Sequence, residues 1–271
     1  MSNGSVRVER REHVAVVTID RPGRRNALGQ AMWAALGSAA EELHGRLPRA
    51  VVITGAGEAF CAGMDVNPDN PQVAKLVGAV ARGEVSPARA MLDELHAVLD
   101  RLFALPVPII AAIGGLAYGG GAELATRCDL RVVDPAATIC FSEVKLGLMP
   151  DLGGGVALSR LIGAGRAADL ILTARKVGAA EAFALGLANR VSAPGGALAE
   201  AIALAETIAT NGPRAVRAAL AVIRGAVDRP AKEAIAAEVE AAARLIASGE
   251  CQVGITALFA RTPPRFVDPE Q

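Results

Sequence analysis

Short apolar runs separated by glycine-rich turns mark the first two thirds of the chain and predict the strands of a mixed α/β fold. Residues 6–10 and 13–19 are β-prone runs with charged residues between them, and they predict an opening hairpin. The run over residues 107–113 is branched and almost continuously apolar, so we expect a strand that is buried on both faces. Similar signals predict further strands at residues 50–54, 137–141 and 187–191.

Apolar residues also recur at helical spacing, which predicts helices at 29–47, 89–105, 122–127, 155–173 and 179–185. Residues 68–87 mix proline, glycine, charged and apolar residues without a period, and we interpret them as an irregular segment and a candidate mobile lid. After residue 195 the patterns are helical only, at 197–210, 213–227, 231–247 and 251–260. This change predicts a core over residues 1–195 and a helical C-terminal subdomain over residues 196–271.

The composition is that of a folded protein with a large core. Of the 271 residues, 52% are hydrophobic and 21% are charged, so disorder is not expected. Lysine plus arginine and aspartate plus glutamate both number 28, which gives no overall field to attract nucleic acid or an anionic membrane. The first residues are polar and charged, and no apolar run reaches transmembrane length, so we expect a cytoplasmic protein.

The cysteines and histidines give no sign of a metal site. The cysteines lack metal-binding spacing, and we expect reduced, mostly buried thiols at Cys61, Cys128, Cys140 and Cys251. The histidines are far apart without acidic or cysteine ligands nearby, and we interpret each as a surface or helix-face residue: His13, His44 and His96. We therefore predict no bound metal.

The densest candidate chemistry lies in residues 114–127, where glycines follow the buried strand. Gly119, Gly120 and Gly121 let the backbone pass close to another group before a helix begins. The first amides of that helix lack a partner within it and carry the positive end of its dipole, so they can hold an anion or a developing oxyanion. Glu123 in the same turn is either a catalytic carboxylate or a residue favoured by the dipole alone, and the glycines could equally serve close packing.

Two other segments carry candidate chemistry. The glycine-rich loop at 55–66 follows a predicted strand, but Phe60 stands where a dinucleotide-binding loop has its third glycine, and no P-loop motif is present. Arg24 and Arg25 at an upstream turn are either a phosphate grip or a solvated pair. Glu143 follows the strand at 137–141 and is either a second catalytic carboxylate or a salt-bridged surface residue.

Four blocks, in order and spacing, resemble the crotonase superfamily of enoyl-CoA hydratases and isomerases. They are Arg21-Pro22 with Asn26-Ala27-Leu28, ITGAGEAFCAGMDV, PIIAAIGGLAYGGGAELATRCDLRVV and FSEVKLGLMPDLGGG. The resemblance runs from about residue 14 to the final helix, where GITALFARTPPRF is similar to the family's terminal pattern. It implies an α/β fold, a crotonase-like spiral of ββα units with two roughly perpendicular sheets and a C-terminal helical trimerisation region. A homotrimer or homohexamer is implied as well.

The resemblance also implies catalytic roles for residues of this chain. Met64 and Gly120 match the two residues whose backbone N–H groups form the oxyanion hole for a thioester oxygen. Glu123 and Glu143 match the two catalytic glutamates of the hydratases, which position a water and move protons. The implied substrate is an acyl-CoA thioester, with coenzyme A as part of the substrate and no permanently bound cofactor.

Further residues are implied in substrate binding. Coenzyme A is expected near Arg24, Arg25 and the backbone of Ala62. Gly63 and Asp65 are further candidates for substrate binding. The acyl chain is expected to run past Met64, Leu116, Tyr118 and Leu146 into a pocket partly closed by residues 68–90, unless these residues only pack the core. Arg261 or Arg265 is a candidate to bind the 3′-phosphate of coenzyme A. The alternative is that each is an ordinary surface arginine.

Retention of both glutamates favours hydration of a trans-2-enoyl-CoA to a 3-hydroxyacyl-CoA. The first alternative is an isomerase, which needs only one carboxylate to move a double bond, or other crotonase-type chemistry. Ser142 and Asp151 depart from the hydratase pattern of proline and glycine. Asp151 would raise the pKa of Glu143 by like-charge repulsion and act as another acid, unless it is only a turn residue before Leu152. The alternative from another class is a non-catalytic member that binds a CoA thioester or RNA, although the balanced charge argues against nucleic acid.

Overall fold

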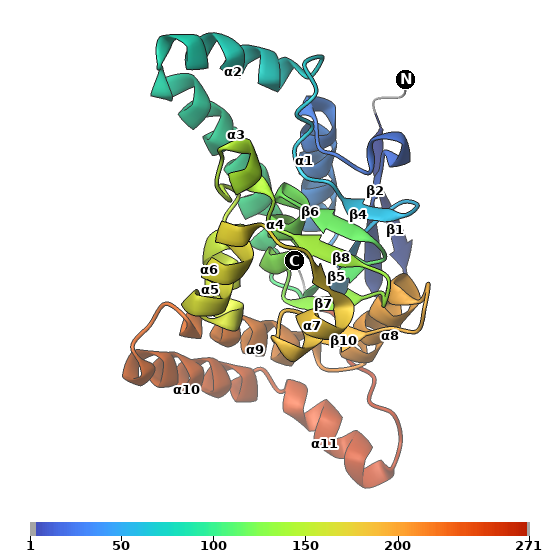
Figure 1. Ribbon diagram of the computed structural model, residues 1–271. Helices are drawn as coiled ribbons and strands as arrows, with labels where there is room; N and C mark the ends of the chain where they lie inside the picture. The colour runs from blue at the N-terminus through green and yellow to red at the C-terminus, as the bar shows by residue number, and fades with distance from the viewer. Residues whose placement is uncertain (1–3, 270–271) are drawn as a thin grey trace.

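The computed structural model describes residues 4–269, which form two β-sheets surrounded by helices (Figure 1). The larger sheet has the strand order β1-β2-β3-β5-β7-β10, with β1 (Ser5–Arg11), β2 (Val14–Asp20), β3 (Ala50–Gly55), β5 (Ile109–Ile113), β7 (Leu130–Val133) and β10 (Arg190–Val191). The smaller sheet has the order β4-β6-β8-β9, with β4 (Ala59–Cys61), β6 (Leu116–Tyr118), β8 (Thr138–Cys140) and β9 (Val177–Gly178). The predicted opening hairpin is confirmed, because β1 and β2 pair antiparallel with Ser5 opposite Asp20.

The chain passes repeatedly from the larger sheet to the smaller one and then into a helical segment. Strand β3 is followed by β4, β5 by β6, and β7 by β8. Within each sheet these strands pair in parallel, and parallel neighbours need crossover connections of this kind. The prediction of an α/β fold with two sheets is confirmed.

The helices lie against the sheets and extend beyond them. The first group is α1 (Gln30–Gly45), α2 (Pro71–Arg82), α3 (Val85–Phe103), α4 (Gly120–Arg127), α5 (Gly154–Ile162), α6 (Ala164–Thr173) and α7 (Ala179–Ala184). The C-terminal group is α8 (Ala197–Ala209), α9 (Pro213–Ala226), α10 (Ala231–Ala247) and α11 (Glu250–Ala260), and two short 3-10 helices are η1 (Pro22–Arg24) and η2 (Glu143–Leu146). The helix predicted at 155–173 is two helices, because Gly163 with φ +83° separates α5 from α6.

The prediction of an irregular segment over residues 68–87 is wrong, since α2 and the start of α3 occupy most of it. Asn70 caps α2 by accepting a hydrogen bond from the Gln72 amide at 3.2 Å, and Pro71 stands at the first turn. Gly83 ends the helix with φ +64°. The residues that indicated an irregular chain therefore mark helix ends. Helix α2 projects from the body at the end opposite to α10 and α11 (Figure 1).

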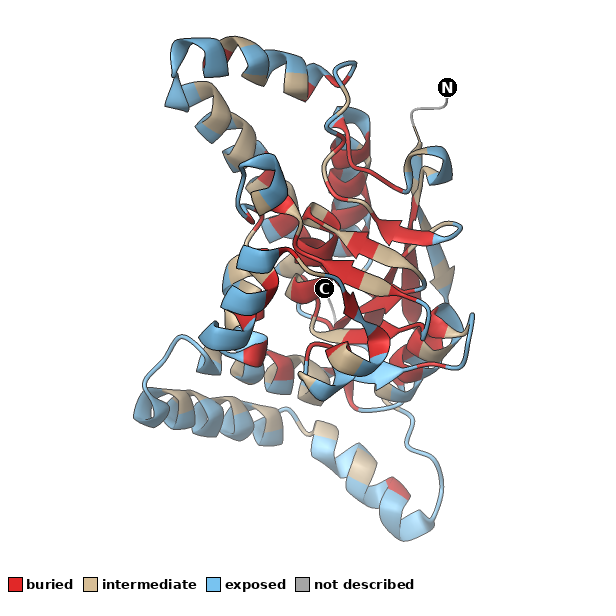
Figure 2. Ribbon diagram, viewed as in Figure 1, coloured by how far each residue is buried: buried red, intermediate tan, exposed pale blue. Residues whose placement is uncertain are grey.

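Side chains of β2 point alternately to the two faces of the larger sheet, and both faces are buried. Val14 and Val16 pack in a cluster with apolar residues of α8, whereas Ala15, Val17 and Ile19 join the cluster that includes α1, α3 and the smaller sheet. Figure 2 shows the buried residues concentrated in the sheets and the helices against them, and α10 buries none of its residues. Because α8 packs on the sheet, it belongs to the packed body, and the division of the chain at residue 195 stays a prediction.

The cysteines of the described chain are free, with Cys61, Cys128 and Cys140 buried and Cys251 exposed. Burial raises the pKa of the Cys61 and Cys128 thiols to about 12, which keeps them protonated. Within residues 4–269, no helix has the length and apolar character needed to cross a membrane. The same residues contain no group of three or more His, Cys, Asp or Glu side chains arranged to hold a metal ion. The cytoplasmic location stays a prediction.

Candidate active site

Two backbone amides meet at one edge of the smaller sheet, where the loops after β4 and β6 lie side by side. Cys61 pairs in parallel with Ala117, so the two strands deliver their following loops to the same edge. A Cβ on Gly63 would lie 2.8 Å from the Gly120 nitrogen, and a Cβ on Gly120 would lie 3.7 Å from the Met64 nitrogen. The structure thus brings together the two amides that the sequence analysis singled out.

Backbone pairing leaves both amides available. The Leu28 amide donates to the Gly63 carbonyl at 2.8 Å, and the Asp65 amide donates to the Leu28 carbonyl at 3.0 Å, so the Met64 N–H points away from this bridge. Gly120 is the first residue of α4, where an amide has no acceptor within the helix. Two such donors at a helix N-terminus favour an oxygen that becomes negative during a reaction.

Glu123 lies in the first turn of α4, and a neighbouring loop binds its buried carboxylate. Oε2 accepts hydrogen bonds from the Leu152 amide at 2.8 Å and the Gly154 amide at 2.9 Å, and Oε1 accepts one from the Asp151 amide at 3.2 Å. Gly154 permits this approach, because a Cβ there would lie 2.3 Å from Glu123 Cγ. Burial raises the pKa of Glu123, while the Gly154 and Leu152 amides counteract it by stabilising the carboxylate. We call residues 151–154 the carboxylate-binding loop.

Glu143 begins η2 and is only 8% exposed. Neither of its carboxyl oxygens has a hydrogen-bond partner within residues 4–269. A Cβ on Gly119 would lie 3.7 Å from Glu143 Oε1, which places this carboxyl beside the start of α4. Burial raises the pKa of Glu143 to about 7, and the nearby Glu123 and Asp151 carboxyls contribute. Glu143 is therefore not the salt-bridged surface residue of the alternative interpretation.

The two glutamates have different surroundings although they are close together. Burial raises the pKa of both, but three amides counteract this at Glu123, whereas neither carboxyl oxygen of Glu143 has a partner in the described part of the chain. Two carboxyls in such different surroundings can serve as a base and an acid in one reaction. Asp151 adds a third carboxyl at the exposed edge, where partial loss of hydration raises its pKa and the nearby His96 acts to lower it.

The arginines predicted to bind coenzyme A lie beside the loop after β4. The Ala62 amide donates to the Arg25 carbonyl at 3.0 Å, and the Arg25 side chain is exposed. Arg24 is half-buried, with Nη2 3.5 Å from a carboxylate oxygen of Asp69. The structure therefore brings Arg24, Arg25 and Ala62 together. Arg261 and Arg265 lie elsewhere in the single chain, in the segment that ends α11 and follows it.

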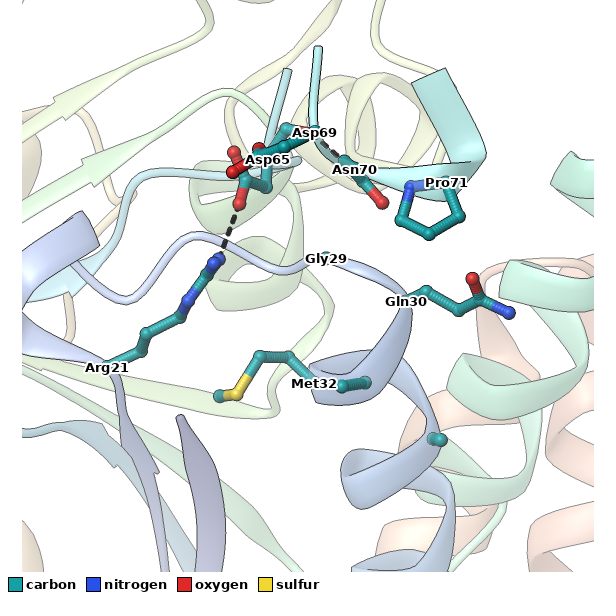
Figure 3. Close-up of a pocket in the computed structure, with 10 residues that line it drawn as sticks. Arg21, Gly29, Gln30, Met32, Asp65, Asp69, Asn70 and Pro71 are labelled. Carbon is teal, nitrogen blue, oxygen red and sulfur yellow. Dashed lines mark hydrogen bonds and ion pairs between the residues drawn. The ribbon is translucent and has the colours of Figure 1, made fainter. Parts of the chain in front are cut away.

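Asp65 is held by Arg21. Figure 3 shows the Asp65 carboxylate turned toward Arg21 at a pocket of about 550 Å³ that is also lined by Gly29, Gln30 and Met32. Oδ2 of Asp65 accepts from Arg21 Nη1 at 2.5 Å. Burial acts to raise the pKa of Asp65, but Arg21 outweighs it and holds this pKa below its usual range. The ion pair gives Asp65 a structural role, and its part in substrate binding stays a prediction.

The residues predicted to contact the acyl chain differ in burial. Leu116 and Tyr118 are half-buried residues of β6. Leu146, at the end of η2, is 64% exposed, so the core-packing alternative is wrong for it. Leu148 and Met149 directly after it are exposed as well, at 55% and 69%. The last residue of η2 and the segment after it therefore expose three apolar side chains, and no motif of the sequence singled out the last two.

Two side chains that the sequence analysis did not place in the site contact the carboxylate-binding loop. His96 Nε2 lies 2.7 Å from the Asp151 carbonyl oxygen, and Arg127 Nη1 donates to the Leu152 carbonyl at 3.1 Å. No local pattern marks a side chain whose partner is a backbone carbonyl 55 residues away.

Comparisons with known proteins place the chain in one family. The family model described as Enoyl-CoA hydratase/isomerase matches residues 9–269. A Thermus thermophilus protein described as a candidate enoyl-CoA hydratase is 39% identical over 255 residues, 94% of this chain and 97% of its own length. A Zymoseptoria tritici enoyl-CoA isomerase/hydratase is 34% identical over 270 residues, 93% of this chain and 83% of its own length. The crystal structure of an enoyl-CoA hydratase from Bacillus anthracis matches with a TM-score of 0.86 at 31% identity, covering 97% of this chain and 98% of that one. This chain therefore belongs to the enoyl-CoA hydratase/isomerase family of the crotonase superfamily.

Proposed function

We propose that this protein is an enoyl-CoA hydratase, which adds water to the 2,3 double bond of a trans-2-enoyl-CoA and yields a 3-hydroxyacyl-CoA. The observation that carries the proposal is the pair of buried carboxyls, Glu123 and Glu143, beside the two available amides of Met64 and Gly120. The names of the relatives include both hydratase and isomerase, so they do not decide between the two reactions. The presence of two acids favours hydration, because hydration uses one as a base and the other as an acid. Coenzyme A enters as part of the substrate, and the addition of water needs no other cofactor.

In this mechanism the Met64 and Gly120 amides hold the thioester oxygen and stabilise the charge that develops there, by about 3 kcal/mol per donor. Glu123, whose ionised form is stabilised by three amides, accepts a proton from water as the water oxygen bonds to Cβ. Glu143, with a pKa raised to about 7 by burial, donates its proton to Cα. Proton transfer from Glu123 back to Glu143 then restores the starting state.

The test is an absorbance assay of the purified protein with crotonyl-CoA and with a longer trans-2-enoyl-CoA, which follows loss of the conjugated enoyl group. We expect wild type to consume at least one substrate, and Glu123→Gln and Glu143→Gln each to lower kcat by about 100-fold or more. The matched control is Glu58→Gln, at an exposed glutamate, and it should keep wild-type activity. The proposal fails if wild type consumes neither substrate or if both active-site variants match it.

An isomerase that converts a 3-enoyl-CoA to a 2-enoyl-CoA is the second candidate, and Asp151 is the observation that favours it. Its carboxyl acts on the pKa of both Glu123 and Glu143, so a further acid stands near the reacting atoms. With a 3-enoyl-CoA as substrate, an isomerase would create the conjugated absorbance. Retention of that activity in Glu123→Gln and its loss in Asp151→Asn would favour isomerisation over hydration.

A further inference from the structure

We propose that His96 is a positioning residue for Glu123, acting through the carboxylate-binding loop; this inference rests on the role proposed above for Glu123. His96 lies on α3, and its Nε2 is 2.7 Å from the Asp151 carbonyl oxygen. That carbonyl and the Leu152 amide belong to one peptide group, and the Leu152 amide donates to Glu123 Oε2 at 2.8 Å. One peptide group therefore joins His96 to the carboxylate.

The geometry of a peptide group makes this link direct. The group is planar, so fixing its carbonyl oxygen also fixes the direction of its N–H. A carbonyl oxygen only accepts hydrogen bonds, so His96 donates from Nε2. Hydrogen bonds in series polarise one another, and the donor at the carbonyl strengthens the N–H that reaches Glu123. His96 thus orients and strengthens a hydrogen bond in which it takes no direct part.

The carboxylate-binding loop contains two glycines, whose backbone is more flexible than that of other residues, so contacts from neighbouring helices are needed to fix its conformation. Gly153 has φ +86°, and Gly154 cannot carry a side chain because a Cβ would lie 2.3 Å from Glu123 Cγ. Arg127 supports the next carbonyl, with Nη1 3.1 Å from the Leu152 oxygen, and its own Nη2 pairs with Asp100 at 2.9 Å. Helices α3 and α4 therefore hold two successive carbonyls of the loop.

The contact does not depend on the protonation state of His96. Both the neutral ring with its proton on Nε2 and the cation donate from that nitrogen. The charged and titratable groups that face His96 and the loop are Asp151 on the loop itself, Glu123 and Arg127 on α4, Asp100 on α3, Arg160 on α5, and Glu143 on η2. Among these groups, Asp151 interacts with the His96 charge, and this interaction acts to lower the pKa of Asp151.

The experiment compares His96→Leu, which removes the donor, with His96→Gln, which keeps an N–H at a similar reach. The matched control is His44→Leu, because His44 Nε2 makes the same kind of contact, 2.8 Å from the Arg101 carbonyl oxygen and outside the site. For hydration we expect His96→Leu to lower kcat by about tenfold or more with KM within about twofold, since a small displacement of a reacting group costs that much. His96→Gln should recover most of the rate, and His44→Leu should match wild type.

A pH profile separates positioning from a general loss of stability. The hydrogen bond from the Leu152 amide lowers the pKa of Glu123. A weaker hydrogen bond in His96→Leu should raise this pKa, and the acid limb of the kcat profile should then move to higher pH in that variant only. Wild-type kcat and an unshifted acid limb in His96→Leu would overturn the proposal.

Hydrogen exchange at the Leu152 and Gly154 amides keeps this test independent of the reaction, because it needs no substrate. Faster exchange in His96→Leu, with His96→Gln and His44→Leu like wild type, supports the link to Glu123, and unchanged exchange overturns it. If wild type hydrates neither substrate, the proposed function fails while the exchange data still decide the role of His96.

Discussion

A buried glutamate without a hydrogen-bond donor costs folding free energy whenever it is ionised. At Glu143 burial raises the pKa from 4.5 to about 7, so the folded state holds this proton more tightly than the unfolded state does. Below pH 4.5 the Glu143 carboxyl is protonated in both the folded and the unfolded state, so it does not lower the free energy of unfolding. As the pH rises to 7 the cost grows, and above that it reaches about 2 kcal/mol, less than the full pKa shift implies because nearby solvent screens the charge.

Replacing Glu143 should therefore stabilise the protein in a pH-dependent way. We expect Glu143→Gln to gain about 2 kcal/mol in the free energy of unfolding at pH 8 and little at pH 4, because glutamine cannot ionise. Urea unfolding of wild type and variant at the two pH values measures this difference. The exposed-site control Glu58→Gln should show no such dependence, and an equal gain at both pH values would contradict the assignment of the cost to ionisation.

At the residue scale, the sequence predicted best the groups that sit at the ends of strands. Met64, Gly120, Glu123 and Glu143 lie in motifs next to apolar runs, and the fold brings them together at one edge of the smaller sheet. Asp151 was expected to raise the pKa of Glu143, and it contributes, but the largest cause is burial. Burial depends on surrounding elements, so no local pattern could predict that part of the rise. His96 was interpreted as a surface or helix-face residue, and it lies on α3. No local pattern could reveal its contact, because the partner is a distant backbone carbonyl.

At the scale of elements, the joint between the carboxylate-binding loop and α5 is set by one glycine. Gly154 begins α5 and donates to Glu123, and an added Cβ would lie 2.3 Å from Glu123 Cγ. Gly155, the next residue, has room, since a Cβ there would lie 3.5 Å from Pro150 Cβ. These neighbours form a matched pair for testing the joint.

We expect Gly154→Ala to push the Glu123 carboxylate out of place and to lower kcat about 100-fold, with a loss of about 1–3 kcal/mol in stability from overpacking. Gly155→Ala should keep nearly all of the activity and gain slightly in stability, because alanine favours a helix over glycine. Hydratase assays and thermal unfolding of the two variants provide the comparison. Similar activities in both would show that Glu123 tolerates displacement.

The elements themselves were predictable to the extent that they are long and periodic. The strand at 107–113 and the helix at 29–47 are confirmed within two residues at each end. Strands β4, β6, β7 and β9 were not predicted, because two to four residues are too few to show a period of two. Helix α2 was not predicted because proline and glycine often interrupt helices. Here Pro71 occupies the first turn and Gly83 ends the helix, and both positions suit these residues.

At the scale of the whole molecule, the C-terminal helices leave apolar surface open in the single chain. Helix α10 buries no residue, and the exposed apolar side chains of α10 and α11 include Ile235, Val239, Ile246, Leu258 and Phe259. Exposed apolar surface of this extent is typical of a protein–protein interface. The homotrimer or homohexamer predicted from the sequence would cover it, and this assembly stays a prediction.

Light scattering after size-exclusion chromatography measures the mass of the assembly, and we expect wild type to elute at three or six times the mass of one chain. Phe259, which is 83% exposed in the single chain, is the sharpest position to test. We expect Phe259→Glu to give smaller species, because an unpaired carboxylate buried between subunits is strongly unfavourable. The matched control is Val80→Glu, since Val80 is 78% exposed on α2 at the opposite end of the molecule (Figure 1), and it should leave the mass unchanged. A monomeric wild type would contradict the predicted assembly. A Phe259→Glu protein of wild-type mass would instead place the contacts between subunits somewhere other than this apolar surface.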